Sequence, residues 1–171
     1  MTERAYKFTR AGAISPFTGF AWPVDEWVEA DGPLGLGANG IHACRVEALP
    51  RWLDDELWEL DVEDVADEIE GVVVARRARL RNRVEAWNAA CSHELARFCA
   101  RRARELADEH PEPLLEAIAG DVAVASESAD PSATAASTYC VAAAAERVVA
   151  GGYWLERRRQ ADWLRFELGL G

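Results

Sequence analysis

The stretch Leu57-Trp58-Glu59-Leu60-Asp61-Val62 indicates that the first half of the chain is rich in β-strands. Its side chains alternate with a period of two, so Glu59 and Asp61 share one face, while Trp58 lies on the other with aliphatic residues. This pattern predicts a half-buried strand with one acidic surface.

Short aromatic or β-branched runs, separated by glycine and proline, recur through residues 1–80 and predict further strands. The predicted strands are Ala5–Thr9, Thr18–Trp22, Glu26–Ala30, Gly40–Cys44, Leu57–Val62 and Gly71–Leu80. Ala48–Asp55 is expected to contain a short helix that starts near Pro50. The segment Asp61–Glu70 is interpreted either as an acidic loop or as one helical turn.

The hydrophobic period changes near residue 83. From Val84 and Trp87 onward the apolar residues follow helical spacing, which predicts a helix that ends near Glu109. Further helices are expected from Pro113 and over Tyr153–Leu168. Asp130-Pro131 forms a good N-cap and first residue for a helix that continues to Ala150.

Strands followed by helices predict the α+β class. We expect an N-terminal mixed or antiparallel sheet of five or six short strands, followed by a C-terminal bundle of about four helices. At 171 residues, a single domain is expected. Its strand-rich acidic part spans residues 1–82 and its helical part spans residues 83–171.

The net charge of −11 lies entirely in the first seventy residues. They contain sixteen acidic and five basic side chains, whereas the remainder of the chain is balanced. Asp54–Glu70 holds ten carboxylates and no Lys or Arg, and five arginines follow between Arg76 and Arg83. Such segregation favours a cationic partner and argues against nucleic acid, whose phosphates would be repelled.

The first functional hypothesis is therefore a cytoplasmic, non-catalytic interaction protein, immunity-like or regulatory, whose acidic face binds a basic protein. The predicted binding residues are Asp54, Asp55, Glu56, Glu59, Asp61, Trp58 and Trp22. A solvated acidic face is the alternative interpretation of these carboxylates. The helices supply either core or the surface of a homodimer.

The expected location is the cytoplasm of a bacterium. Basic residues are almost all arginine, with Lys7 as the only lysine, and alanine is abundant, which is typical of a GC-rich genome. No secretory signal is recognisable, and the apolar runs are far shorter than the roughly 20 residues of a membrane span. The four cysteines are therefore expected to be reduced.

The second hypothesis is an enzyme or small-molecule-binding protein. If Gly40-Ile41-His42-Ala43-Cys44-Arg45 is a strand, His42 and Cys44 share a face, and a thiolate beside an imidazole is a common nucleophile. The catalytic candidates are His42, Cys44 and Arg45, in a cleft lined by Trp22 and Trp58. The alternative is structural, with a histidine bonded to backbone and a small buried thiol.

No cofactor or metal is predicted. The glycine-rich segment Pro33–Gly40 lacks the spacing of a phosphate-binding loop and does not open a helix after a strand. Cys91 and His93 could add to His42 and Cys44 as zinc ligands. However, side chains two residues apart on a helix point in directions that differ by about 200°, so only one of Cys91 and His93 would face a given site.

Two resemblances accompany these patterns. The order Tyr6-Lys7-Phe8, Gly19-Phe20-x-Trp22-Pro23 and Gly40-Ile41-His42-Ala43-Cys44 resembles small domains of actinobacteria and phages, built around a Gly-Ile-His-Ala-Cys strand and of unassigned chemistry. This resemblance covers about half of the chain. The segment Glu156-Arg157-x-x-Gln160-x-x-Trp163-Leu164 is similar to tails of actinobacterial proteins and to immunity proteins of toxin systems. The second resemblance implies a protein partner.

Overall fold

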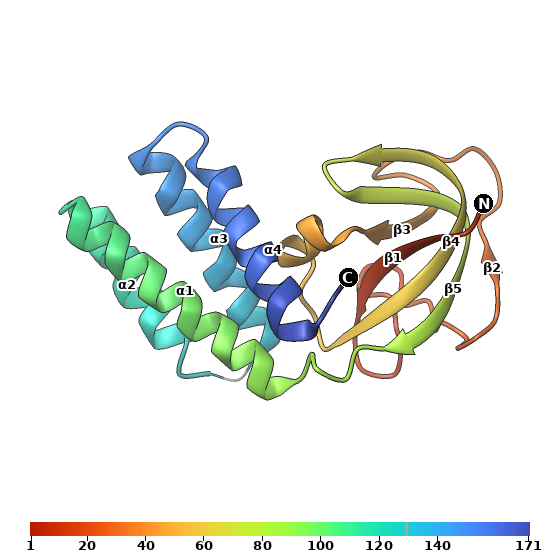
Figure 1. Ribbon diagram of the computed structural model, residues 1–171, viewed down its shortest axis with the longest axis horizontal. Coiled ribbons are helices and arrows are strands. Elements are labelled where there is room, and N and C mark those ends of the chain that lie inside the picture. Colours follow the sequence, from red (N-terminus) through yellow and green to blue (C-terminus); the bar gives the residue numbers. More distant parts are fainter. Residues whose placement is uncertain (129) are drawn as a thin grey trace. The chain divides into compact units, whose positions relative to one another are not determined.

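The chain folds into a strand-rich unit and a helical unit, as a computed structural model of residues 1–128 and 130–171 shows (Figure 1). The two compact units are Met1–Glu85 and Ala86–Gly171. The boundary lies close to the predicted change of period at residue 83. The predicted α+β class, with an N-terminal sheet and a C-terminal set of four helices, is confirmed.

Five strands and one short helix form the first unit. They are β1 (Glu3–Thr9), β2 (Val28–Glu29), β3 (Ile41–Cys44), the 3₁₀ helix η1 (Val46–Arg51), β4 (Glu56–Ile69) and β5 (Val72–Arg83). All pairs between these strands are antiparallel. The short helix starts earlier than expected, at Val46, so that Pro50 lies inside it and not at its start.

The sheet closes on itself. β1 pairs with β4 on one edge and with β3 on the other, while β5 pairs with both β3 and β4. These pairings make a small ring of four strands, and β2 extends it along β5. Closure leaves the inward side chains of each strand facing one shared interior.

The hairpin of β4 and β5 corrects one prediction. Asp61–Glu70, expected as an acidic loop or a helical turn, continues β4 as far as Ile69. Its chain reverses at Glu70 and Gly71, whose φ values of 51° and 75° suit a tight two-residue hairpin turn. Asp61 and Glu63 lie opposite Arg79 and Arg77 of β5 in the register, which favours a strand at these carboxylates.

The predicted strand Thr18–Trp22 is also wrong. The chain there folds back on itself, because Ser15 N–H donates to Phe20 O at 2.8 Å and Trp22 N–H donates to Ala13 O at 2.9 Å. Only isolated bridges form in this loop. It places Trp22 inside the ring of strands instead of in the sheet.

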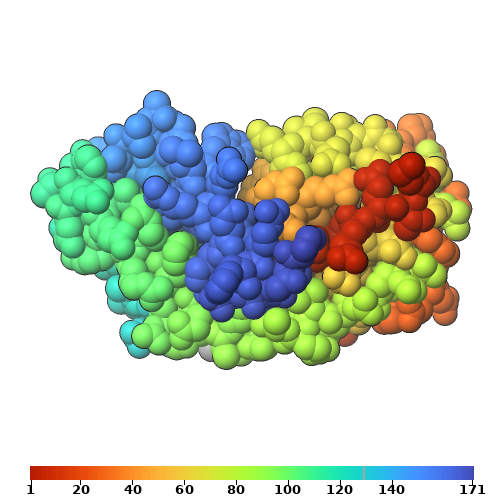
Figure 2. All heavy atoms as spheres, viewed as in Figure 1, coloured from red at the N-terminus to blue at the C-terminus, as the bar shows by residue number. Residues whose placement is uncertain are grey.

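The core of the strand-rich unit combines small and branched side chains from every side of the ring. It contains Ala5, Ala13, Trp22, Ile41, Ala43, Leu60, Val62, Val73, Ala75, Ala78 and Leu80. Figure 2 shows the N-terminal residues, in dark red, on the surface beside the orange η1 segment. Arg45, directly before η1, connects this segment to β1 and β4, since its guanidinium binds Glu3 at 2.5 Å and Glu68 at 2.8 Å.

The second unit contains α1 (Ala89–Glu109), α2 (Pro113–Ala125), α3 (Pro131–Val148) and α4 (Gly152–Leu168). α1 begins later than predicted, because the Asn88 side chain caps it by accepting from Ala90 N and Cys91 N. Val84 and Trp87 therefore precede the helix instead of lying on its stripe. Asp130 caps α3 as expected, accepting from Ser132 N.

The four helices pack side by side (Figure 1). α1 and α3 are in contact with each other, α2 packs against both of them, and α4 packs mainly against α3. Alanines and a few larger side chains such as Leu95, Val141 and Leu164 fill the space between them. Buried polar groups cross-link α3 and α4, where Arg157 donates to Thr138 Oγ1 at 3.0 Å and Gln160 donates to Thr138 O at 2.9 Å. None of the described helices is both long and apolar enough to cross a membrane.

Candidate functional site: a cavity between two strands

β1 and β3 part from each other at one end, and a cavity opens there. Their register contains a single Cα pair, Tyr6 with Cys44. Beyond that pair, the rest of β1 and the start of β3 diverge, although continued pairing would have set Lys7 opposite Ala43. Residues 6–8 of β1 and 41–44 of β3 line the cavity, which has a volume of about 760 Å³.

Three loops complete the walls of the cavity. They contribute segments 15–22, 37–40 and 51–54, and β2 adds Val28 and Glu29. Aromatic rings dominate the loop side. Phe20 meets Trp22 edge to face at 5.4 Å between ring centroids, and Phe17 meets Trp52 at 6.4 Å. Phe17 is 85% exposed and so forms part of an apolar rim open to solvent.

Lys7 is the only lysine of the chain, and it lines this cavity. It lies on the same face of β1 as the core residue Ala5, because the two are separated by two positions. Its Nζ donates to His42 O at 2.7 Å and lies 5.5 Å from the centroid of the Trp22 ring. Among the described carboxylates, none forms an ion pair with it.

Burial lowers the pKa of Lys7 from 10.5 to about 8. Desolvation disfavours the charged amine, and the nearby Cys44 opposes this effect only in part. The amine therefore exists partly in its neutral, nucleophilic form near physiological pH. Sequence reasoning missed this residue, although a single lysine at an inward position of an arginine-rich chain was a visible signal.

The His42 ring is held by the loop beside it. Its Nε2 accepts the Gly37 N–H at 3.1 Å, so its Nδ1 carries the proton and donates to Gly40 O at 3.1 Å. Both ring nitrogens are thus bonded to backbone. This geometry matches the structural alternative for His42 and leaves no ring nitrogen to accept a proton from Cys44.

Cys44 is fully buried, and its thiol donates to Tyr6 O at 3.4 Å. Burial raises the pKa of Cys44 to about 12, so the thiol stays protonated. Arg45 points away from this chemistry, since Glu68 and Glu3 bind it and their hydrogen bonds raise the pKa of the guanidinium. The catalytic roles of His42, Cys44 and Arg45 remain untested predictions that this geometry does not favour.

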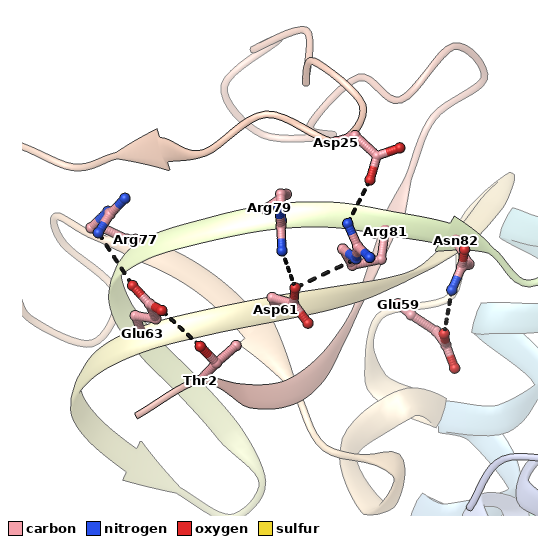
Figure 3. A network of polar contacts seen from close by, with 9 residues as sticks. All are labelled: Thr2, Asp25, Glu59, Asp61, Glu63, Arg77, Arg79, Arg81 and Asn82. Atoms are coloured by element: carbon pink, nitrogen blue, oxygen red, sulfur yellow. Dashed lines mark hydrogen bonds and ion pairs between the residues drawn. The ribbon is translucent and has the colours of Figure 1, made fainter.

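Arginines of β5 occupy the acidic outer face of β4 (Figure 3). Asp61 binds Arg79 at 2.7 Å and Arg81 at 3.5 Å. Glu63 binds Arg77 at 3.2 Å. The face on which the docking hypothesis rests is therefore largely neutralised within the unit, and a basic protein partner remains a prediction.

The other predicted binding residues divide between these two places. Glu59 accepts from Asn82 at 3.1 Å on the outer face, and Asp55 accepts from Ala11 N at 3.1 Å. Trp58 packs against the core and does not line the cavity. Trp22 and Asp54 do line it, so the predicted cleft beside the His42 strand exists with one of its two expected tryptophans.

Glu56 is a buried structural carboxylate, only 7% exposed. Burial alone would raise its pKa, but the N–H groups of Ala13 and Gly12, the Trp58 indole and the Arg83 guanidinium together hold the pKa below its usual value. Its oxygens accept from Ala13 N at 3.0 Å and Gly12 N at 3.2 Å. Glu56 therefore anchors the loop that leads to Trp22.

Metal ligands, disulfides and known relatives give no further indication of function among the described residues. Across residues 1–128 and 130–171, no group of three or more His, Cys, Asp or Glu side chains is placed to hold a metal ion. The four cysteines form no disulfide. Comparison of the chain with protein-family models, with curated proteins and with solved structures found no match.

Proposed function

We propose that the strand-rich unit binds a small, largely apolar molecule whose polar head meets Lys7. The observation that carries this proposal is the cavity of about 760 Å³, with aromatic walls and one amine that has no carboxylate partner among the described residues. Apolar pockets with a few convergent polar groups are the usual form of small-molecule sites. A buried amine without a counter-ion costs stability, which binding offsets if the ligand supplies the partner.

A titration with 2-naphthoate tests the proposal, because this probe has a flat apolar body and one carboxylate. We expect it to quench tryptophan fluorescence, since Trp22 and Trp52 line the cavity. The expected dissociation constant is on the order of 10–100 µM. Absence of binding at millimolar probe would contradict the proposal.

Three variants locate the bound probe. Lys7→Met should weaken binding at least about tenfold, because it removes the charge and keeps most of the side-chain volume. Ala38→Trp should block the cavity, since Ala38 is exposed at its rim. Arg10→Met is the matched control: it removes one positive charge just beyond the end of β1, outside the cavity lining, and should leave binding unchanged. Equal effects of Lys7→Met and Arg10→Met would exclude a specific site.

A further inference from the structure

We propose that Lys7 forms an imine with a ligand that carries an aldehyde group, in the cavity between β1 and β3. This inference rests on the proposed function and names the chemical class of its ligand. Three observations place the reaction there: Lys7 lines the cavity, its amine donates a hydrogen bond to a backbone carbonyl of the cavity wall, and no described carboxylate holds it as a charged partner.

The surroundings of the amine suit both states of such a reaction. The His42 carbonyl, 2.7 Å from Nζ, accepts a hydrogen bond from either the neutral amine or the ammonium ion. The Trp22 ring faces Nζ at 5.5 Å and favours a positive charge at this point, including that of a protonated imine. The lowered pKa, about 8, supplies a substantial neutral fraction.

The atoms of the step balance without any other reactant. The lone pair of the neutral amine attacks the aldehyde carbon, and the former carbonyl oxygen takes a proton and becomes a hydroxyl group. The carbinolamine then loses this hydroxyl as water while nitrogen loses its remaining proton, which leaves a C=N bond. Nothing is oxidised or reduced, and hydrolysis reverses the step.

The other titratable groups at the cavity do not compete for this role. They are Tyr6, Glu29, His42, Cys44, Arg51 and Asp54. Phenol, carboxylate and guanidinium groups do not form imines with aldehydes. His42 has both ring nitrogens bonded to backbone, and the Cys44 thiol stays protonated. Arg51 binds Glu70 at 3.1 Å. Lys7 is therefore the nucleophile that this cavity offers to a carbonyl carbon.

The test treats the chain with 2-naphthaldehyde and sodium cyanoborohydride, which reduces an imine to a stable secondary amine. Because Lys7 is the only lysine, peptide mass mapping separates its product from that of the N-terminal amine without ambiguity. The variant Arg10→Lys adds an exposed lysine as an internal reference. At pH 7.5 we expect trapping at Lys7 to be at least about tenfold faster than at position 10, because more of its amine is neutral.

Further controls separate a site from general amine chemistry. Ala38→Trp and excess 2-naphthoate should each slow trapping at Lys7 and leave the N-terminal amine unaffected. Trapping at Lys7 that is no faster than at position 10, or that neither control slows, would overturn the imine proposal. If 2-naphthoate still binds in that case, the proposed function stands and only the aldehyde chemistry fails.

Discussion

The outer face of the β4–β5 hairpin and the cavity between β1 and β3 differ in whether their charged side chains form ion pairs. On the hairpin, each of Asp61 and Glu63 lies opposite an arginine and binds it. In the cavity, Lys7 lies among aromatic rings with no described carboxylate as its partner. Asp61 and Glu63 of the acidic segment are thus paired within the hairpin, while Lys7 has no carboxylate partner among the described residues.

This comparison shows why segregation of charge along a chain is a poor guide to charge on a surface. A hairpin turn at Glu70-Gly71 folds the acidic segment directly onto the arginines that follow it. Cross-strand pairs of this type contribute little each, roughly 0.2–1 kcal/mol, but they cancel the local field. The largest predictions therefore concern buried charges, and the smallest concern the exposed pairs.

The strongest effect is expected at Glu56. Glu56→Ala should destabilise the chain by about 3 kcal/mol, because the N–H of the buried residue Ala13 and the N–H of Gly12 lose their acceptor. The matched control, Glu59→Ala, lies on the same strand with partners only on the outer face and should cost less than about 1 kcal/mol. Urea denaturation measures both, and equal losses would erase the distinction between buried and outer carboxylates.

The pH dependence of Glu56 follows from its lowered pKa. Because the folded-state pKa lies below the unfolded one, the contribution is full above the ordinary value of 4.5 and is lost as pH falls through the folded value. Glu56→Gln should therefore flatten the acid limb of the stability curve. An acid limb that the substitution leaves unchanged would count against this assignment.

Lys7→Met should act in the opposite direction and stabilise the free protein by on the order of 2 kcal/mol at neutral pH. The native pKa of Lys7, about 8, lies below the ordinary 10.5, so the unfolded state binds more protons between these values. Wild-type stability therefore rises with pH through that window, and the advantage of the variant disappears above it. If Lys7→Met were less stable than wild type at pH 7, the claim that the unpaired amine of Lys7 costs stability would be wrong.

The smallest effect is expected at the pair of Asp61 and Arg79. Their side chains are 27% and 26% exposed, so a double-mutant cycle with alanine should give a coupling energy of about 0.5–1 kcal/mol that falls with added salt. The more exposed pair of Glu94 and Arg97 on α1 should give less. A coupling of several kcal/mol would mean that the outer pairs are not the weak, screened contacts described here.

Much of the fold could be predicted from the sequence, because periodicity and capping are local signals. The caps at Asp130 and the change of period near residue 83 lead directly to the observed order of elements. The length of β4 does not follow from the local pattern, because a run of carboxylates favours a loop or a helical turn and the arginine partners of Asp61 and Glu63 lie on β5, across a turn. The register that pairs them depends on recognising Glu70-Gly71 as a hairpin turn.

The candidate site was predictable only in outline. The strand with His42 and the contribution of Trp22 were visible, whereas the cavity depends on the way distant loops surround the parted end of β1 and β3. Alternation places Lys7 on the face of Ala5 and Thr9, which are completely buried. The cavity beside Lys7 could not be predicted from this alternation, because loops distant in the sequence form its other walls.

The central claim is that Lys7 is a half-buried amine with a lowered pKa, placed to pair with a ligand in the cavity. Nuclear magnetic resonance titration of the only lysine, followed through its side-chain nitrogen and ε-carbon, tests it directly. We expect a Lys7 pKa near 8 in the free protein, and we expect this pKa to rise when saturating 2-naphthoate supplies a carboxylate. A pKa near 10.5 that the probe leaves unchanged would contradict it.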